Sequence, residues 1–161
     1  MPLALPPPND GHDDMRDLPD NLRKEVLSLQ EWATANQHQA RTDFIRFWAL
    51  KLVAISSSAL AALFTALELK IINTGLAAGA AVCVAIDGLY PGGTLHDVHL
   101  TAVYDLRDLA SKSKRQYRRG VLNGEDPRKL EERILGEIQV ERDRITKYLK
   151  DADTGLGKAK A

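Results

Sequence analysis

Two long apolar runs in the middle of the chain limit its possible folds more than any other feature. The first is FWALKLVAISSSALAALFTALEL, from Phe47 to Leu69, and its only charged residues are Lys51 and Glu68. The second is IINTGLAAGAAVCVAIDGLY, from Ile71 to Tyr90, and its only charged residue is Asp87. Each run has about the ~20 residues that span a ~30 Å hydrocarbon layer. Neither has the polar face of a surface helix, so we expect residues 47–90 to form a two-helix transmembrane hairpin.

A soluble helical bundle with two fully buried central helices is the main alternative. Ala and Gly dominate the second run, and both residues are only weakly apolar. The remainder of a 161-residue chain, however, supplies few other helices to surround two such rods. A hairpin that lies in the membrane interface, or that inserts conditionally, is a third alternative. We favour membrane insertion over both.

The segment before the hairpin divides at Pro19. Residues 1–19 are rich in Pro and Asp, so they cannot bury a core and we expect a disordered tail. Residues 20–46 are expected to form a cytoplasmic helix, because a heptad seam recurs along them. This seam consists of Leu22, Val26, Leu29, Ala33, Asn36 and Ala40. Because neither Gly nor Pro occurs from Asp20 to Asn73, the helix can continue unbroken into the first apolar run.

Residues 91–152, after the hairpin, are expected to form a cytoplasmic helical hairpin. Pro-Gly-Gly at 91–93 breaks the chain, and Thr94 follows as a candidate N-cap. Gly120 and the Asn-Gly pair at 123–124 mark a loop, after which Asp126 and Pro127 restart a helix as N-cap and first residue. The apolar stripe of this last helix is Leu130, Ile134, Ile138, Ile145 and Leu149. Residues 153–161 are expected to be a disordered tail, and the fold class is all-α.

The distribution of Lys and Arg predicts the orientation of the hairpin. Five basic residues precede the first run and fifteen follow the second, whereas the tip has only Lys70, which Glu68 offsets. Positive residues stay on the cytoplasmic side, so both termini are expected inside the cell. Trp48 and Tyr90 then lie at the inner interface, where amphipathic aromatic side chains anchor a span.

Two opposite charges lie inside the apolar runs at a similar distance from the turn. An antiparallel hairpin therefore brings Lys51 and Asp87 to a similar depth. An intramembrane ion pair between them lessens the cost of two charges near the bilayer. Alternatively, each side chain extends separately to the interface. The sequence leaves these two arrangements equally open.

Small residues recur at four-residue spacing on both runs and suggest a helix-packing face. The set is Ser58, Ala62 and Ala66 on the first run, and Gly75, Gly79 and Cys83 on the second. Small side chains let helix backbones approach closely in lipid. This face serves either packing within one hairpin or assembly of a homo-oligomer. Because two helices enclose no channel, a pore requires assembly.

Little in the sequence favours catalysis. Basic and acidic residues number 22 each, so no net charge attracts nucleic acid, and no specific nucleic-acid partner is expected. The single cysteine, Cys83, excludes an internal disulfide and a cysteine-based zinc site. His96 and His99 lie three residues apart without a third ligand, so we expect them on the helix surface near the head groups. The basic cluster at 112–119 suits anionic lipid or a solvated face. We predict no enzyme activity, no cofactor and no metal site.

The order of these parts resembles the SLATT domain family, which also has a charged helix, two spans with a short link, and a helical cytoplasmic tail. The most specific stretch is the exit from the second run, LYPGGTLHDVHLTAVYDLRDL, Leu89 to Leu109. Families of this type have a Pro near that exit and then His or Tyr, Ala and Leu positions on a helix. In this chain those positions are Pro91, His99, Ala102, Tyr104 and Leu106. The resemblance covers roughly Glu31 to Leu149 and rests mostly on architecture.

The resemblance implies a function that the residues by themselves do not. SLATT proteins are thought to be membrane effectors of bacterial conflict systems that form pores and kill or arrest an infected cell. It therefore implies an oligomeric, pore-forming effector in the bacterial inner membrane, encoded near a sensor or nucleotide-second-messenger synthase. A soluble all-helical interaction module and a small channel or transporter subunit are the alternative functions.

Overall fold

The computed structural model describes residues 15–67, 70–89 and 92–158, and its secondary structure is helical throughout, with no strand among these residues. A single 3₁₀ turn, Met15–Asp17, precedes four α-helices. These are α1 (Asp20–Ala66), α2 (Lys70–Leu89), α3 (Gly92–Leu122) and α4 (Pro127–Lys158). The all-α prediction is confirmed.

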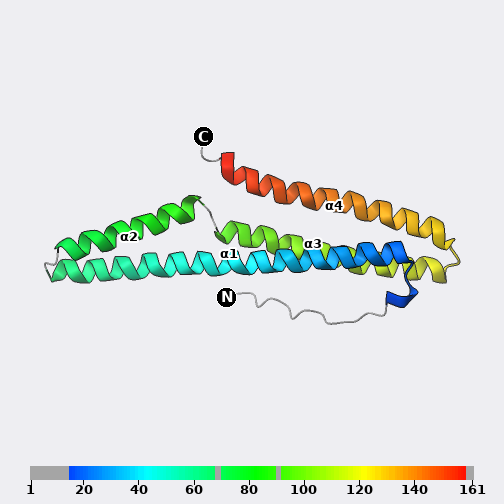
Figure 1. Ribbon diagram of the computed structural model, residues 1–161, viewed down its shortest axis with the longest axis horizontal. Coiled ribbons are helices and arrows are strands. Elements are labelled where there is room, and N and C mark those ends of the chain that lie inside the picture. The colour runs from blue at the N-terminus through cyan, green and yellow to red at the C-terminus, as the bar shows by residue number, and fades with distance from the viewer. Residues whose placement is uncertain (1–14, 68–69, 90–91, 159–161) are drawn as a thin grey trace.

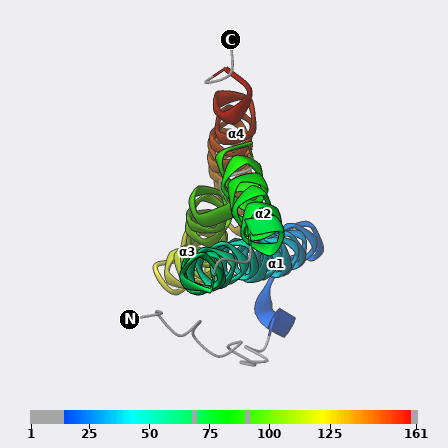
Figure 2. The same cartoon turned by 90° about the vertical axis from the view of Figure 1, so that its left-hand side faces the viewer.

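Helix α1 is the axis on which the other helices are arranged (Figure 1). Its 47 residues give it a length of about 70 Å at 1.5 Å per residue. The expectation that residues 20–46 continue unbroken into the first apolar run is confirmed. Helices α2 and α3 follow each other back along α1, α2 against its second half and α3 against its first half. Helix α4 then packs on α3, and its C-terminal end lies away from α1 in both views (Figure 2).

The core of the molecule lies between α1, α3 and α4. Every member of the predicted seam of α1, from Leu22 to Ala40, is buried. It meets Ala102, Leu106 and Leu109 of α3. The predicted stripe of α4 joins the same cluster, with Leu130, Ile134, Ile138 and Ile145 buried and Leu149 packed against them. The heptad seam is thus buried within one chain. It is not exposed for contact with a second chain.

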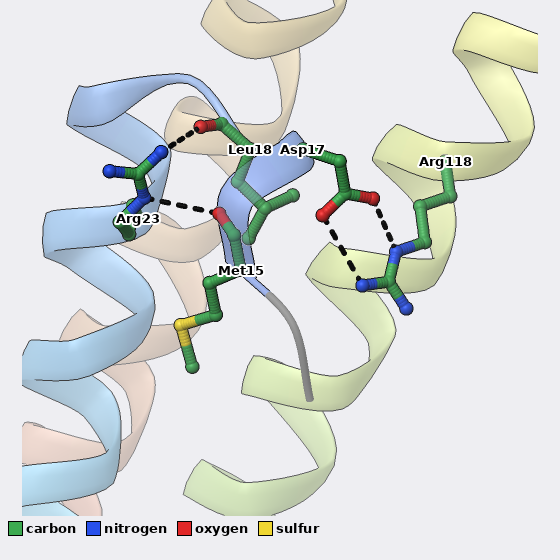
Figure 3. Close-up of polar contacts among 5 residues, drawn as sticks. All are labelled: Met15, Asp17, Leu18, Arg23 and Arg118. Carbon is green, nitrogen blue, oxygen red and sulfur yellow. Dashed lines mark hydrogen bonds and ion pairs between the residues drawn. The ribbon is translucent and has the colours of Figure 1, made fainter. Parts of the chain in front are cut away.

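Residues 15–19 do not belong to a disordered tail, and the predicted boundary at Pro19 is wrong. The Leu18 side chain is buried in the three-helix core. Arg23 donates from Nε to the Met15 carbonyl at 3.1 Å and from a terminal nitrogen to the Leu18 carbonyl at 3.0 Å (Figure 3). Asp17 reaches across to Arg118 of α3, at 2.7 Å from its Nε. These contacts are tertiary, so composition by itself did not reveal them. Residues 1–14 of that predicted tail lie outside the described residues.

Glycines lie at both ends of α3. Helix α3 begins at Gly92, two residues before the predicted N-cap Thr94. A Cβ on Gly92 would lie only 3.0 Å from the Asp43 carbonyl oxygen. The glycine therefore lets α3 start directly against α1. At the other end, Gly124 has a φ of 78°, which favours glycine. Its amide donates to the Val121 carbonyl and the next amide to the Gly120 carbonyl, each at 3.0 Å, which is a Schellman C-cap.

Helix α4 starts as the sequence predicts and ends later than predicted. The Asp126 carboxylate accepts a hydrogen bond from the Arg128 amide at 2.9 Å, so Asp126 is the N-cap and Pro127 the first helical residue. The helix then continues through residues 153–158, which we expected to be a tail. No Pro interrupts this end, and the Thr154 hydroxyl donates to the Lys150 carbonyl at 2.9 Å. Residues 159–161 lie outside the described part of the chain.

Candidate functional site

The outer surface of the α1–α2 hairpin is apolar and exposed. Two stretches, one within Asp20–Thr65 and one within Ile71–Leu122, are long and apolar enough to cross a membrane, and only 6% of each is buried in the chain. The large exposed side chains of this surface include Leu52 at 59%, Ile55 at 64% and Ile71 at 91% exposure. The core helices of a soluble bundle would instead be mostly buried. An exposed apolar surface of this kind is typical of a site that contacts a membrane or another protein.

A narrow seam joins the two helices of the hairpin. The more buried positions of α1 recur at three- and four-residue spacing, and so do those of α2. They are Leu50, Ala54, Ser57, Ala61 and Phe64 on α1, and Asn73, Leu76, Ala80 and Cys83 on α2. Near the tip, the Asn73 amide donates to the Thr65 hydroxyl at 2.7 Å, and that hydroxyl donates to the Ala61 carbonyl at 2.8 Å. Asn73 and Thr65 are thus hydrogen-bonded within the hairpin.

Most of the small-residue face points away from this seam. Ser58, Ala62, Gly75 and Gly79 are exposed, and a Cβ on either glycine would meet nothing within 4 Å. Cys83, in contrast, is a member of the seam. The side chain of Ala66 is outside the described set. Packing within one hairpin therefore uses a different face of α2 from Gly75 and Gly79. These two glycines remain exposed on the surface of the hairpin.

Lys51 and Asp87 do not form an ion pair in this structure. The Lys51 ammonium lies 4.1 Å from the centre of the Phe47 ring on its own helix, and its side chain is exposed. Asp87 is half-buried, and no described residue donates a hydrogen bond to its buried Oδ1. Of the two arrangements that the sequence left open, this geometry corresponds to separate side chains, with Lys51 stabilised by an aromatic face.

The base of the hairpin carries an aromatic cluster. Trp48 is 47% exposed and makes edge-on ring contacts with Phe44 and Phe47 at centroid separations of 6.2 Å and 5.9 Å. Its position suits an interfacial anchor, because one part of the ring packs while another part remains accessible. The second predicted anchor, Tyr90, lies outside the described residues.

A buried polar junction joins α1 to α3 next to this aromatic cluster, and sequence reasoning did not identify it. His99 Nδ1 lies 3.0 Å from Asn36 Oδ1, and its Nε2 lies 3.8 Å from Asp43 Oδ2. His96 Nδ1 lies 2.8 Å from the Ala40 carbonyl oxygen. The expectation that both histidines lie on the helix surface is therefore wrong. Asn36 and Asp43 occupy seam-like positions on α1, and that polar interruption was the available signal.

Further from the hairpin, the polar groups of the bundle are arranged as paired charges. Arg142 of α4 lies 3.0 Å from Glu25 of α1. A cavity of about 280 Å³ between α3 and α4 is lined by Thr101, Asp105, Arg144, Ile145 and Tyr148. Arg144, one of these lining residues, lies 3.3 Å from Asp105 and 2.7 Å from Glu141, so one guanidinium contacts two carboxylates.

Two ionisable groups of the bundle have shifted acidities. The hydrogen bond from Arg118 lowers the pKa of Asp17, and burial works against it. Burial raises the pKa of Tyr117, and the nearby carboxylate of Glu131 adds to that effect. Both shifts reflect packing at the end of the bundle remote from the hairpin.

Among the residues that the structure describes, no group of three metal-ligating side chains comes together. No family model, no curated protein and no solved structure matches the chain. The exposed apolar hairpin is therefore the feature of the structure from which a function can be inferred.

Proposed function

We propose that this protein is a membrane-embedded effector that oligomerises through its α1–α2 hairpin and forms a pore. The observation that supports this function most directly is the exposed apolar surface of the hairpin. Burying one large aliphatic side chain is worth about 1.5–3 kcal/mol. Many such side chains are exposed on α1 and α2, so water is an unfavourable surrounding for this half of the molecule.

The dimensions of the hairpin fit a bilayer. Helix α2 has 20 residues and is about 30 Å long, which equals the usual hydrocarbon thickness. Asn73 and Thr65 bond to each other at the far end, while Trp48 and Lys51 on α1 and Asp87 on α2 belong to the turns nearest the bundle. The polar and amphipathic groups thus bracket an apolar band.

The oligomeric step of the proposal follows from the geometry of two helices. A hairpin packed along one seam has no lumen, so ions cross only if several hairpins surround an axis. The exposed glycine step at Gly75 and Gly79 is a surface on which a second helix can approach closely. The buried heptad seam of the bundle offers no such surface. Lipid and further copies of the chain are therefore the proposed partners.

The cellular setting of the proposal comes from the resemblance to SLATT proteins. On that basis the protein resides in the bacterial inner membrane as a two-pass protein with both termini in the cytoplasm. It acts in an abortive-infection-like defence system, and its activating partner is a sensor or a nucleotide-second-messenger synthase encoded nearby. Of the 22 Lys and Arg residues, 20 lie in the segments that flank the hairpin, and this asymmetry agrees with a cytoplasmic bundle.

Expression in bacteria, with membrane potential and viability recorded together, tests this function. We expect depolarisation to precede loss of viability, and the protein to remain in the membrane pellet after alkaline carbonate washing. A membrane-bound protein that leaves the potential and viability unchanged would favour an ordinary transporter or channel subunit. Recovery as a monodisperse species without detergent would favour a soluble interaction module.

The orientation is tested in a Cys83→Ala background with one introduced cysteine at a time. Both Thr74, near the tip, and Ser111, on α3, are exposed. We expect Thr74→Cys to react with an impermeant thiol reagent on intact spheroplasts, and Ser111→Cys to react only after lysis. The opposite labelling would place the bundle outside the cytoplasm.

A further inference from the structure

The end of α3 that is remote from the hairpin concentrates positive charge. Residues 112–119 contain five Lys or Arg residues and no Asp or Glu, although the chain as a whole has no net charge. Three of the five are exposed and recur at three- and four-residue spacing, so they share one face of the helix. These residues, here called the basic stripe, are Lys112, Arg115 and Arg119. Like charges on one helix face repel, so an anionic partner would stabilise the stripe.

The proposed membrane is too far away to supply that anion. Helix α3 begins at Gly92 beside the hairpin and runs away from it along α1 (Figure 1). Lys112, the nearest member of the basic stripe, lies about 30 Å from Gly92 along the helix axis. The Debye length at physiological ionic strength is about 8 Å, so head-group charge is screened at that distance. Within the bundle, Asp108 lies 3.9 Å from Arg115, but both side chains are largely exposed and the contact is weak.

Asp17 already brings one carboxylate of the N-terminal region to this end of α3. Its Oδ2 lies 2.7 Å from Arg118 Nε, and its Oδ1 lies 3.3 Å from a terminal nitrogen of the same guanidinium (Figure 3). Leu18 is buried in the three-helix core and Met15 packs against that core, so the turn that carries Asp17 is held in place. The chain that precedes this turn is therefore tethered next to the basic stripe.

The sequence just before this turn has the opposite charge to the stripe. Residues 10–14, here called the acidic segment, lie outside the described part of the chain, and residues 1–14 contain no Lys or Arg. The carboxylates of the segment are Asp10, Asp13 and Asp14. An extended chain spans about 3.3–3.6 Å per residue, so Asp14 can lie up to about 10 Å from Asp17, and Asp10 up to about 24 Å. The stripe extends only about 9 Å along the axis of α3 from Arg118, so every carboxylate of the segment can reach it.

We propose that the acidic segment of the chain binds its own basic stripe and covers it against other polyanions. The Asp17–Arg118 ion pair is the described end of this contact. Because the segment belongs to the same chain, it competes at an effective concentration in the millimolar range. Displacement of the segment exposes a cationic face of α3. The inference concerns the remote end of the bundle and does not require pore formation, so it can fail or succeed independently of the proposed function.

Binding of a polyanion to the full chain in non-ionic detergent micelles tests the proposal. The probe is fluorescein-labelled heparin, and fluorescence anisotropy at low salt measures its affinity. The variant Asp10→Asn/Asp13→Asn/Asp14→Asn, here called the segment variant, removes the competing carboxylates and keeps the length of the chain. We expect it to bind heparin about tenfold more tightly than the wild type, because three exposed ion pairs no longer have to be broken. Equal affinities, including no binding by either protein, would overturn the proposal.

Two further variants separate the local contact from a change in overall charge. The matched control removes three exposed carboxylates elsewhere on the bundle and is Glu31→Gln/Asp97→Asn/Asp143→Asn. It changes the net charge as much as the segment variant does, and we expect a much smaller gain in heparin affinity. Adding Lys112→Gln/Arg115→Gln/Arg119→Gln to the segment variant should abolish the gain, because the stripe is then neutral. An equal gain in the control, or a gain that survives without the stripe, would contradict the proposed site.

Carbodiimide crosslinking of the wild type detects the contact directly. The reagent joins a carboxylate to an ammonium that touches it, and Lys112 supplies the ammonium of the basic stripe. We expect mass spectrometry of the monomer band to show an amide between the acidic segment and Lys112 at low salt. This amide should disappear at about 1 M salt, where the Debye length is about 3 Å. Absence of the amide at low salt, or amides with the exposed Lys24 or Lys129 in its place, contradicts the proposal.

Discussion

The two halves of α1 have the same seam spacing and opposite exteriors. In the first half, Leu29 is fully buried against α3 and α4, and charged side chains such as Lys24 and Glu31 are exposed on the outside. In the second half, small residues such as the buried Ala61 lie along α2, and the outside carries the exposed Leu52 and Ile55. One continuous helix therefore presents a polar surface along one part of its length and an apolar surface along the other.

The difference shows that seam spacing does not determine the surroundings of a helix. A three- and four-residue repeat brings helices together in both halves. The residues on the outer face decide whether water or lipid surrounds the pair, because an exposed apolar side chain is unfavourable in water and neutral in hydrocarbon. The bundle is stabilised by its buried core, whereas the stability of the hairpin depends on whether its outer surface meets water or an apolar medium.

The largest effect should come from truncating the seam of the bundle. Leu29→Ala removes a side chain that is 0% exposed, so we expect the free energy of unfolding to fall by about 2–5 kcal/mol. Leu52→Ala, on the outer face of the hairpin, is the matched control and should change stability in detergent far less. Circular dichroism during thermal or chemical unfolding measures both. Equal losses would indicate that Leu52 is buried in a core.

A charge on the outer face should affect the hairpin and not the bundle. Ile55→Lys places an ammonium in the middle of the first apolar run, where insertion is opposed by about 2.5–3.5 kcal/mol. We expect the membrane-bound fraction after carbonate washing to fall. Leu27→Lys changes an exposed position of the bundle half and should leave fractionation unchanged. A soluble protein would tolerate both substitutions equally.

A large side chain in place of Gly79 should distinguish two roles of the Gly75–Gly79 face, packing within one hairpin and assembly between hairpins. Gly79→Leu fills space that is empty in the single chain, so the hairpin should fold and insert. We expect it to lose crosslinked oligomers, and to lose toxicity if the wild type is toxic. Ala81→Leu adds bulk at another exposed position of α2 and should crosslink normally. Wild-type crosslinking by Gly79→Leu would exclude this face from assembly.

The smallest effect should come from the contact between Asp17 and Arg118. Arg118 lowers the pKa of Asp17, so this carboxylate contributes stability above its ordinary pKa and loses it as the pH falls through the lowered value. The pair is partly exposed, which limits the contribution to about 0–1 kcal/mol. Asp17→Asn should therefore be slightly less stable than the wild type at pH 6 and equal to it at strongly acidic pH. A constant difference in unfolding free energy over this range would contradict the assignment.

Local patterns were sufficient to predict most of the helices. The seam from Leu22 to Ala40 follows from spacing, and the start of α4 follows from Asp126 and Pro127, because a cap and a first residue act within one turn. The two apolar runs likewise stand out by length and composition. The resemblance of the whole layout to SLATT proteins, and the function that it implies, stay predictions.

The tertiary structure decided what lies opposite each residue. Asp17 and Arg118 are 101 positions apart, and His99 and Asn36 are 63 apart, so no local pattern relates them. Nor does spacing tell which side of α2 meets α1, which is why Cys83 lies in the seam while Gly79 points outward. Sequence periodicity specifies the faces that a helix has, and only the packing of the whole chain determines which face is covered.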